Sequence, residues 1–455
     1  MAALTTPRAA IGRGAMRRAI SLVVIGVAVA LLAFTVHAAG AAERHVILIS
    51  IDALRPEFYL DAAYGASELR ALMSAGSAAR AAESVFPTVT YPSHATIVTG
   101  VRPLRHGVAF NAMLDPVGER GRWYEEAADL RATPIWEWAR AAGLRTASVS
   151  WPSTRGARID ALLPEGNYYA RGDAVEAITS ASTPGLFARL GVTPAPEIFK
   201  DAVKWDAFLT ATASAIIRQD RPHLLLLHLV QADSVQHAGG VSAPELSQAV
   251  ARLDAHVGVL RRALRAAGIA DRAVVIVTGD HGFQDITRAV FPNALLARAG
   301  LRACPTGGEG WRATVHTAGG GAAVFVNPSA GADAAARAER TLRAGASDRY
   351  TVLTRAELDD LGAMPGAAFG LEAAPGWVIG GTCGRGGEGR ARGGTHGFLP
   401  NRPSMLTGFI AAGPGVRAGV LLDRIRLVDI APTAARLLGL TPPAVEGRVL
   451  DAILE

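Results

Sequence analysis

Four short segments of this chain carry side chains that bind transition metals. Each follows an apolar run or a glycine-rich loop, so each sits where a chain leaves a buried strand or turns sharply. Together they hold three aspartates and three histidines: Asp52, Asp233, His237, Asp280, His281 and His396. Three carboxylates and three imidazoles are enough ligands for two transition-metal sites.

A fifth segment supplies hydroxyl groups. Residues 86–94 read Phe-Pro-Thr-Val-Thr-Tyr-Pro-Ser-His, so Thr88 and Thr90 both come just before a helix expected to start near Pro92. The first turn of a helix has free backbone amides that bind phosphate. Two metals beside a hydroxyl at such a helix start are the parts needed for phosphoryl transfer.

Buried strands must position these segments. The runs at 45–51, 223–230 and 273–278 are continuously apolar rather than alternating, which is typical of parallel strands covered on both faces. Residues 146–151 form a weaker fourth strand because serines dilute the pattern. The metal-ligand segments stretch from 52 to 396, so most of the chain must form one fold for them to meet.

A helix is predicted between the second and third strong runs. Ser242 and Glu245 are spaced as a capping box, with Pro244 in the first turn, and apolar residues recur at helical spacing over 246–264 before Gly268. Strand, helix and strand of these lengths favour a crossover unit. We therefore predict an α/β sandwich with a largely parallel sheet.

Ligands of such sheets bind beyond the carboxyl ends of the strands, and all three aspartates are expected there. Residues 112–210 and 300–390 are less periodic and rich in Gly, Pro and Ala. We interpret them as insertions that shape a substrate entrance.

The first 42 residues resemble a signal peptide. Four arginines precede an apolar stretch at 19–36, and small residues then offer cleavage sites. The alternative is an uncleaved membrane anchor, because 18 apolar residues nearly span a bilayer. We predict a periplasmic or secreted protein, with membrane anchoring as the alternative, and residues 43–455 as its catalytic domain.

Removing that segment lowers the formal charge from +6 to about +2. No basic stripe remains, so the sequence has no nucleic-acid-binding signature. The two cysteines, Cys304 and Cys383, are not in a CxxC arrangement. A disulfide and two free thiols both stay open.

The ordered set of motifs resembles the nucleotide pyrophosphatase/phosphodiesterase family of the alkaline phosphatase superfamily. Beyond the ligand segments, the resemblance is carried by Phe86–His94, Thr96–Gly100, Pro103, His106–Val108, Asn111, Trp151–Pro152 and Val428–Thr433. It runs from about residue 45 to 445 and implies the alkaline phosphatase-like α/β/α sandwich. Ser93 stands where the family has Asn, which puts local hydrogen bonding in doubt.

The resemblance also implies roles. Asp233, His237 and His396 would bind one zinc ion, and Asp52, Asp280 and His281 a second, beside the Thr90 oxygen. Thr90, rather than Thr88, would be the nucleophile, and Asn111 with the amides near Pro92 would hold a phosphate oxygen. Tyr91, or Tyr168 or Tyr169, would stack on a nucleobase, although ordinary packing explains each tyrosine as well. We expect His94 and His106 to be core or turn histidines.

The resulting prediction is an exported zinc-dependent hydrolase of phosphodiester or phosphoanhydride bonds, with a nucleotide or another small phosphodiester as substrate. A phosphomonoesterase and a phosphonate hydrolase remain alternatives, but related enzymes of those kinds use lysines, and this chain has only Lys200 and Lys204. A sulfatase is disfavoured because Cys304-Pro305-Thr306 lacks the Cys-x-Pro-x-Arg motif. A non-catalytic binding protein is the remote alternative, since neither a ligand nor the nucleophile is missing.

Overall fold

The structure, a computed structural model, describes residues 2, 44–168, 172–303, 310–383 and 387–455. Most of the predicted targeting segment 1–42, together with Tyr169 and Cys304, lies outside the described residues. In the part of the chain that is described, no helix is both long and apolar enough to cross a membrane. Cys383 is disulfide-bonded.

Nine strands of the described chain form the central sheet. The order across it is β18 (Val420–Leu422), β2 (Ser77–Glu83), β17 (Thr407–Ala412), β8 (Ala273–Thr278), β1 (His45–Ile51), β7 (Leu224–Leu229), β5 (Thr146–Trp151) and β6 (Ala161–Pro164), with β19 (Ile425–Arg426) also beside β2. The strands from β8 to β6 are parallel, and β17 runs antiparallel to both of its neighbours. The largely parallel sheet predicted from the sequence is confirmed.

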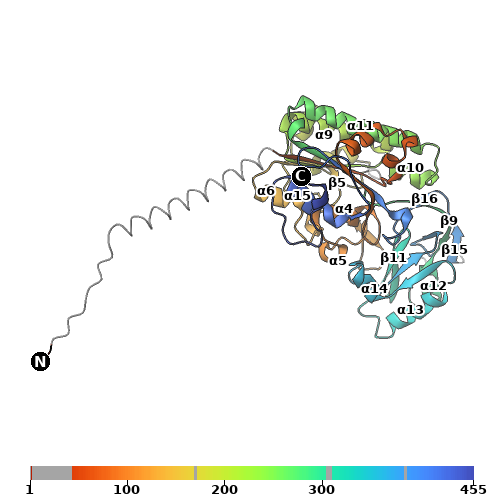
Figure 1. The fold of residues 1–455 in the computed structure, drawn as a ribbon. Coiled ribbons are helices and arrows are strands. Elements are labelled where there is room, and N and C mark those ends of the chain that lie inside the picture. The colour runs from red at the N-terminus through yellow and green to blue at the C-terminus, as the bar shows by residue number, and fades with distance from the viewer. Residues whose placement is uncertain (1, 3–43, 169–171, 304–309, 384–386) are drawn as a thin grey trace.

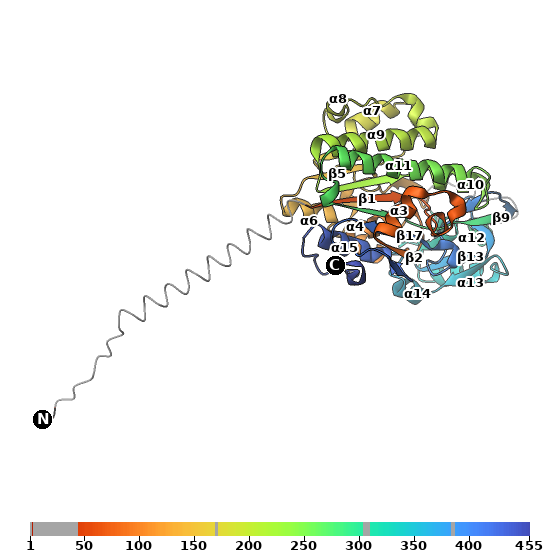
Figure 2. The same cartoon turned by 45° about the horizontal axis from the view of Figure 1, so that its top comes forward.

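Continuous apolar runs form the middle strands because both faces of the sheet are covered. Alternate residues of β1 enter two different cores, so no residue of the strand faces water. One face is covered by α3 (Ser67–Ala75), α7 (Ala174–Ala181), α8 (Leu186–Leu190), α9 (Ala202–Asp220) and α11 (Leu246–Ala266), as Figure 2 shows. The other face is covered by α4 (Thr90–Thr99), α6 (Ile135–Ala141) and α15 (Ile430–Leu437) (Figure 1).

The long helix α11 fills the predicted place between β7 and β8, but its start differs from the prediction. The helix begins at Leu246, and Glu245 at its N-cap makes no side-chain capping bond, so the predicted capping box is wrong. A turn closed by hydrogen bonds from Ala243 to Gly240 and from Leu246 to Ala243 occupies the residues before it. Gly268 follows the last turn with a φ of 69°, as a helix-ending glycine does.

The range 112–210, expected as an insertion, contributes to the sandwich itself. It holds β5 and β6 of the central sheet, and α6 and the first half of α9 that cover it. Among the described residues of this range, a hairpin of β3 (Ala112–Leu114) and β4 (Arg120–Trp123) forms a two-stranded sheet separate from the central one, in the way an insertion does. Periodicity is weak here because the elements are short and separated by long turns.

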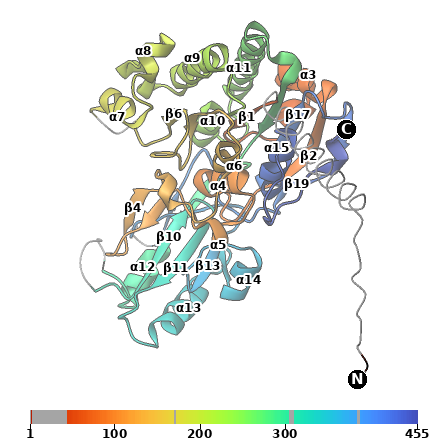
Figure 3. The ribbon, with the colours of Figure 1, turned by 90° about the vertical axis from the view of Figure 1, so that its left-hand side faces the viewer.

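A separate unit covers residues 284–395, which we call the subdomain. Its antiparallel sheet has the order β10 (Ala313–Ala318), β11 (Gly321–Val326), β13 (Phe369–Ala373) and β12 (Tyr350–Leu353). A second small sheet joins β14 (Gly376–Ile379), β9 (Gln284–Val290), β15 (Glu388–Arg390) and β16 (Gly394–Thr395). With α12 (Pro292–Arg298), α13 (Ala334–Ala344) and α14 (Arg355–Asp360), it packs around its own core beside the sandwich (Figures 1 and 3).

Candidate active site

Three adjacent parallel strands deliver the three aspartates to one edge of the sheet. Asp52 directly follows β1, and Asp280 lies two residues beyond β8. Asp233 lies on α10 (Gln231–Gly239), which begins two residues after β7 ends. Because β7, β1 and β8 are neighbours in the sheet, their carboxyl ends bring the aspartates together, as the sequence predicted.

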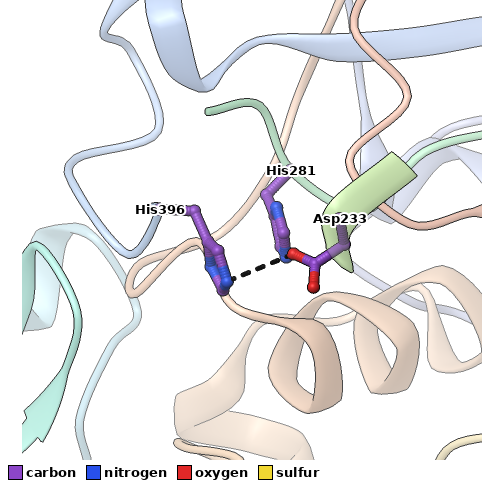
Figure 4. A group of neighbouring side chains, drawn as sticks. All are labelled: Asp233, His281 and His396. Carbon is purple, nitrogen blue, oxygen red and sulfur yellow. Dashed lines mark ion pairs between the residues drawn. The ribbon is translucent and has the colours of Figure 1, made fainter. Parts of the chain in front are cut away.

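Asp233, His237 and His396 form the first cluster of candidate metal ligands, which we call the first ligand cluster. The Nε2 atom of His237 lies 3.4 Å from Oδ1 of Asp233, and Nε2 of His396 lies 3.6 Å from the same oxygen. The two Nε2 atoms are 3.2 Å apart. Asp233 and His237 are four residues apart on α10 rather than on a loop, so one helix face presents both. Figure 4 shows His396 and Asp233 pointing toward one another, with His281 beside them.

Asp52, Asp280 and His281 form the second cluster of candidate metal ligands, which we call the second ligand cluster. Nε2 of His281 is 3.3 Å from Oδ1 of Asp52 and 3.3 Å from Oδ2 of Asp280. The His281 ring stacks on the His396 ring, with centroids 3.6 Å apart and planes 10° apart. The clusters therefore adjoin, and His281 is also within 4.8 Å of ligand atoms of Asp233 and His396.

Four of the converging atoms are buried and have no hydrogen-bond partner among the described residues. They are Oδ1 of Asp52, Oδ1 of Asp233, Oδ2 of Asp280 and Nε2 of His281. A buried polar atom without a partner costs free energy, so native proteins rarely keep one. Four at one point, all of types that bind transition metals, fit metal ions as their missing partner.

Backbone carbonyls aim each histidine into the site. Nδ1 of His237 is 3.2 Å from the Gly394 oxygen, and Nδ1 of His281 is 3.1 Å from the Gly282 oxygen. Nδ1 of His396 is 2.9 Å from the Thr88 oxygen. In each ring this outer bond leaves Nε2 for a metal, which is how proteins usually orient imidazole ligands.

Burial suppresses charge throughout the two clusters. It raises the pKa of Asp52 to about 7, with Asp233 adding to the effect, and raises the pKa of Asp233 to about 8, with Asp280 adding to it. Burial, with His237 adding to the effect, lowers the pKa of His396 to about 3. Without a cation, burial favours the neutral forms of these carboxyl groups and imidazoles over the charged forms. A bound cation would reverse this preference for the carboxyls.

Thr90 is the first residue of α4, and contacts on both sides hold it against the clusters. Two residues before it, the Thr88 carbonyl binds His396 of the first cluster. Four residues after it, Nδ1 of His94 lies 2.8 Å from the Thr90 carbonyl and 3.6 Å from Oδ2 of Asp280 in the second. Thr90 itself is 8% exposed.

Asn111 lies beside the start of α4. Its Oδ1 accepts a 3.0 Å hydrogen bond from the Tyr91 amide, which leaves its amide nitrogen as a donor. The expectation that several helix-start amides hold a phosphate needs correction. Pro92 has no N–H, the Ser93 amide donates to Val89, and the Tyr91 amide is already bonded. The amide of Thr90 and the side chain of Asn111 remain.

Thr88 has a structural role, as the sequence interpretation assumed when it chose Thr90. Its Oγ1 donates to the Phe398 carbonyl at 3.0 Å and accepts from the Gly397 amide at 3.0 Å. Both partners belong to the residues that directly follow His396. The Thr88 hydroxyl is therefore engaged in holding a ligand loop in place.

The proposed stacking tyrosines are packed instead. Tyr91 is fully buried, with its ring edge-on to Trp123 at 5.3 Å between centroids. Tyr168 is buried against Phe199 and Trp205. Neither ring offers a face to a substrate, so the geometry favours the packing alternative for both.

The remaining histidines of this region and the departing Ser93 are also buried. His106 shares a 3.0 Å hydrogen bond with the Thr96 hydroxyl, and burial lowers its pKa to about 3, which fits a core residue. Ser93 Oγ is 2.8 Å from Ser84 Oγ, and Ser84 donates to the Asp280 carbonyl at 2.6 Å. Ser93 thus keeps a hydrogen-bonded link to the second cluster.

Sequence reasoning missed His228 and Glu165. Nε2 of His228 is 3.2 Å from Oδ2 of Asp52, and its Nδ1 is 2.7 Å from Oε2 of Glu165. The two carboxylates raise the pKa of His228 well above its usual value despite complete burial. One signal was present in the sequence: His228 is the single polar residue of the strand Leu224–Leu229.

Comparison with known proteins gives the site a context. The family model described as type I phosphodiesterase / nucleotide pyrophosphatase matches residues 46–398. Human ectonucleotide pyrophosphatase/phosphodiesterase family member 7 is 25% identical over 435 residues, covering 90% of this chain and 82% of that protein. Human family member 1 is 25% identical over 257 residues, which is 54% of this chain but only 24% of that longer protein.

The fold has solved counterparts. The structure of human ectonucleotide pyrophosphatase/phosphodiesterase 5 superposes with a TM-score of 0.68 over 90% of this chain and all of that one, at 19% identity. The murine counterpart, an inactive form in complex with AMP, gives a TM-score of 0.66 at 21% identity. At such identities the likeness concerns the fold, and it agrees with the predicted alkaline phosphatase-like α/β sandwich.

Proposed function

Because the chain belongs to the type I phosphodiesterase / nucleotide pyrophosphatase family, a family of hydrolases, we propose that it hydrolyses phosphodiester or phosphoanhydride bonds of nucleotides or similar small molecules. We propose Thr90 as the nucleophile and two zinc ions as cofactors. The observation that carries the proposal is the set of four buried, partnerless ligand atoms beside the start of α4.

The donor set favours zinc. Three imidazoles and three carboxylates match the ligands of zinc, whereas magnesium and calcium prefer oxygen ligands alone. Asp233, His237 and His396 would hold one ion, and Asp52, Asp280 and His281 the other. When bound, such ions lower the pKa of a hydroxyl and stabilise negative charge on phosphoryl oxygens.

The residues of the chain perform the remaining steps. The Thr90 oxygen attacks phosphorus and loses its proton to solvent, and the bond from phosphorus to the leaving oxygen breaks, with its electron pair staying on that oxygen. Water then attacks the same phosphorus and loses a proton, the bond from phosphorus to Thr90 breaks, the Thr90 oxygen takes up a proton again, and the phosphate product is released. The amide nitrogen of Asn111 and the backbone amide of Thr90 donate to a phosphate oxygen, whose charge grows during each attack.

A diester fits the surroundings better than a monoester dianion. Arg55, three residues beyond Asp52, is bonded to Glu57, the Gln236 side chain and the Val241 carbonyl. The charge of Arg55 is therefore compensated by groups of the protein rather than by a substrate. Murine ectonucleotide pyrophosphatase/phosphodiesterase 5 was solved with AMP, and this supports a nucleotide as the first substrate to test.

The test is a substrate comparison with the zinc-loaded protein. We expect bis(p-nitrophenyl) phosphate and a nucleotide p-nitrophenyl ester to be hydrolysed with higher kcat/KM than p-nitrophenyl phosphate. A strong preference for the monoester would assign the protein to the phosphomonoesterase branch. Absence of all hydrolysis with both metal sites filled would favour the non-catalytic alternative.

Export is proposed on the sequence alone. The segment 1–42 has the composition of a signal peptide, and an uncleaved anchor is the alternative. Amino-terminal sequencing of the protein recovered from the producing cell distinguishes them: a start near residue 43 indicates cleavage, and a start at residue 1 with membrane association indicates an anchor.

A further inference from the structure

We propose that His228, held by Glu165, is a positioning residue that fixes the orientation of the Asp52 carboxylate, so that one of its oxygens faces the metal. The inference rests on the proposed function, because it takes Asp52 to be a metal ligand. It concerns a strand residue and a loop residue that lie behind the ligand clusters and contribute no atom to either of them.

The place of His228 follows from the register of the central sheet. It lies opposite Ser50 across the β1–β7 ladder, so its ring reaches the level of the carboxyl end of β1, where Asp52 follows. The ring is 1% exposed. Its Nε2 meets Oδ2 of Asp52 at 3.2 Å and its Nδ1 meets Oε2 of Glu165 at 2.7 Å.

The two oxygens of Asp52 have different surroundings. Oδ2 is bonded to His228, whereas Oδ1 is buried without a partner, 3.3 Å from Nε2 of His281. A carboxylate that could rotate freely would turn its plane, and with it the unpartnered oxygen, away from the cluster. The bond to His228 prevents this, because it gives one oxygen a fixed partner and directs the other to the ligand cluster.

The imidazole cannot swing away from Asp52. The His94 ring packs against it, with centroids 4.3 Å apart, and Trp151 packs edge-on against His94 at 4.9 Å. Glu165 closes the far side through its bond to Nδ1. The ring is therefore held by packing on its face and by hydrogen bonds at both nitrogens.

A purely structural role explains the arrangement poorly. The other residues of β7 are leucines, which fill a strand buried on both faces without polar partners. An imidazole between two carboxylates in such a strand carries a desolvation cost that an apolar residue avoids. The arrangement is explained if Asp52 must hold one orientation.

Substitution by glutamine or asparagine tests the two hydrogen bonds of His228 one at a time. The amide nitrogen of glutamine reaches about as far as Nε2, and that of asparagine about as far as Nδ1. His228→Gln thus keeps a donor for Asp52 and loses the one for Glu165, whereas His228→Asn does the reverse. Removing a partner that orients a metal ligand typically costs about 10–100-fold in metal affinity.

The measurement is zinc retained per protein after equilibration with graded chelator, with zinc alone as the probe. We expect His228→Asn to lose one of two zinc ions about 10–100-fold more readily than the unaltered protein, and His228→Gln to stay within about threefold. Raising free zinc should restore turnover by His228→Asn with KM unchanged. The matched control is His256→Asn on α11, a partly buried histidine that belongs to neither cluster, which should keep both ions.

Glu165→Leu is the second variant, since this side chain is 17% exposed and tolerates change better than a strand residue. It should lower the affinity for one zinc ion by a smaller factor than His228→Asn does. Unchanged zinc affinity in both His228→Asn and Glu165→Leu would overturn the proposal, as would equal losses in the Gln and Asn variants. An unaltered protein that holds two zinc ions and hydrolyses diesters keeps the proposed function even then. An unaltered protein that holds no zinc removes both proposals.

Discussion

Single hydrogen bonds decide what the residues of this site can do. In each of the three candidate ligand histidines, Nδ1 is bonded to a backbone carbonyl, which orients the ring so that Nε2 faces the cluster. Thr88 and Thr90 differ in the same way. The Thr88 hydroxyl has two backbone partners, and the hydroxyl of Thr90 stands at the helix start where a phosphate would bind.

Thr90→Ala should remove turnover without removing metal. All six carboxylate and imidazole ligands remain, so zinc content should stay at two ions per chain. Activity should fall by several orders of magnitude, as on deleting a covalent nucleophile. The measurement is kcat with a diester alongside zinc content. Near-normal turnover by this variant would show that Thr90 is not the nucleophile.

Thr88→Ala should act on stability instead of chemistry. The change leaves the Gly397 amide and the Phe398 carbonyl without their buried partner, at a cost of about 1–3 kcal/mol of unfolding free energy. Thr88→Ser keeps the hydroxyl and should recover most of it. Urea unfolding measures the loss. A stable Thr88→Ala protein that is inactive at saturating zinc would move the nucleophile to Thr88.

Asn111 allows a test of its donor separately from its acceptor. Asn111→Asp keeps an oxygen for the Tyr91 amide but replaces the free donor with a negative charge. We expect kcat/KM to fall about 100–1,000-fold, as when an oxyanion donor is lost. The kcat/KM of Asn111→Ala should fall less than that of Asn111→Asp, because alanine adds no charge that repels the phosphate. The reverse order of the two variants would contradict a phosphate-binding role.

At the level of elements, the sequence predicted the strands and therefore the positions of the aspartates that follow them. The bounds of β1, β5 and β8 agree with the predicted runs, and the three aspartates meet because their strands are neighbours. His228 was missed because its role depends on register between two strands distant in sequence. The capping box at Ser242 failed because a preceding turn moved the helix start by several residues.

The loop carrying His396 depends on glycines packed against the subdomain. Gly397 has a φ of 95°, and a Cβ there would lie 1.7 Å from the Ala318 oxygen. Gly397→Ala should therefore displace the His396 loop, lower the affinity for one zinc ion and lower the melting temperature. Gly65→Ala is the control, because φ is 70° and no atom lies within 4 Å of its Cβ.

Gly65→Ala tests the backbone strain alone, which costs about 1–2 kcal/mol. Zinc titration and thermal unfolding of both variants separate steric displacement from strain. Equal zinc affinity in the two would show that the His396 loop tolerates the clash.

At the scale of the whole molecule, buried acids make the metal-free protein sensitive to pH. Asp52 and Asp233 have folded pKa values raised to about 7 and about 8 from 3.8, so their contribution to stability is greatest below pH 4 and is lost as pH rises through those values. Histidines with lowered pKa, such as His396, oppose this only below about pH 6.5, where the unfolded chain gains protons.

Between pH 6.5 and 8 the buried acids change the stability of the metal-free protein, whereas the histidines with lowered pKa do not. The melting temperature of the metal-free protein should therefore fall over this range. The zinc-loaded protein should not fall with it, because protons compete with zinc for the same ligands and zinc binding strengthens as pH rises. Thermal unfolding with and without zinc at pH 6.5 and 8 measures both trends. A melting temperature that rises over this window without metal would contradict the buried-acid interpretation.

The position of β17 in the central sheet determines when this protein can finish folding during synthesis. Residues 407–412 form a strand between β2 and β8. The sequence of β2 leaves the ribosome hundreds of residues earlier, and that of β8 more than one hundred residues earlier. Until the last tenth of the chain has been made, β2 and β8 each lack their neighbour and expose backbone amides and carbonyls. Nascent chains that stall before residue 407 should therefore be open to strand pairing with other chains, and holding them apart is a task for chaperones.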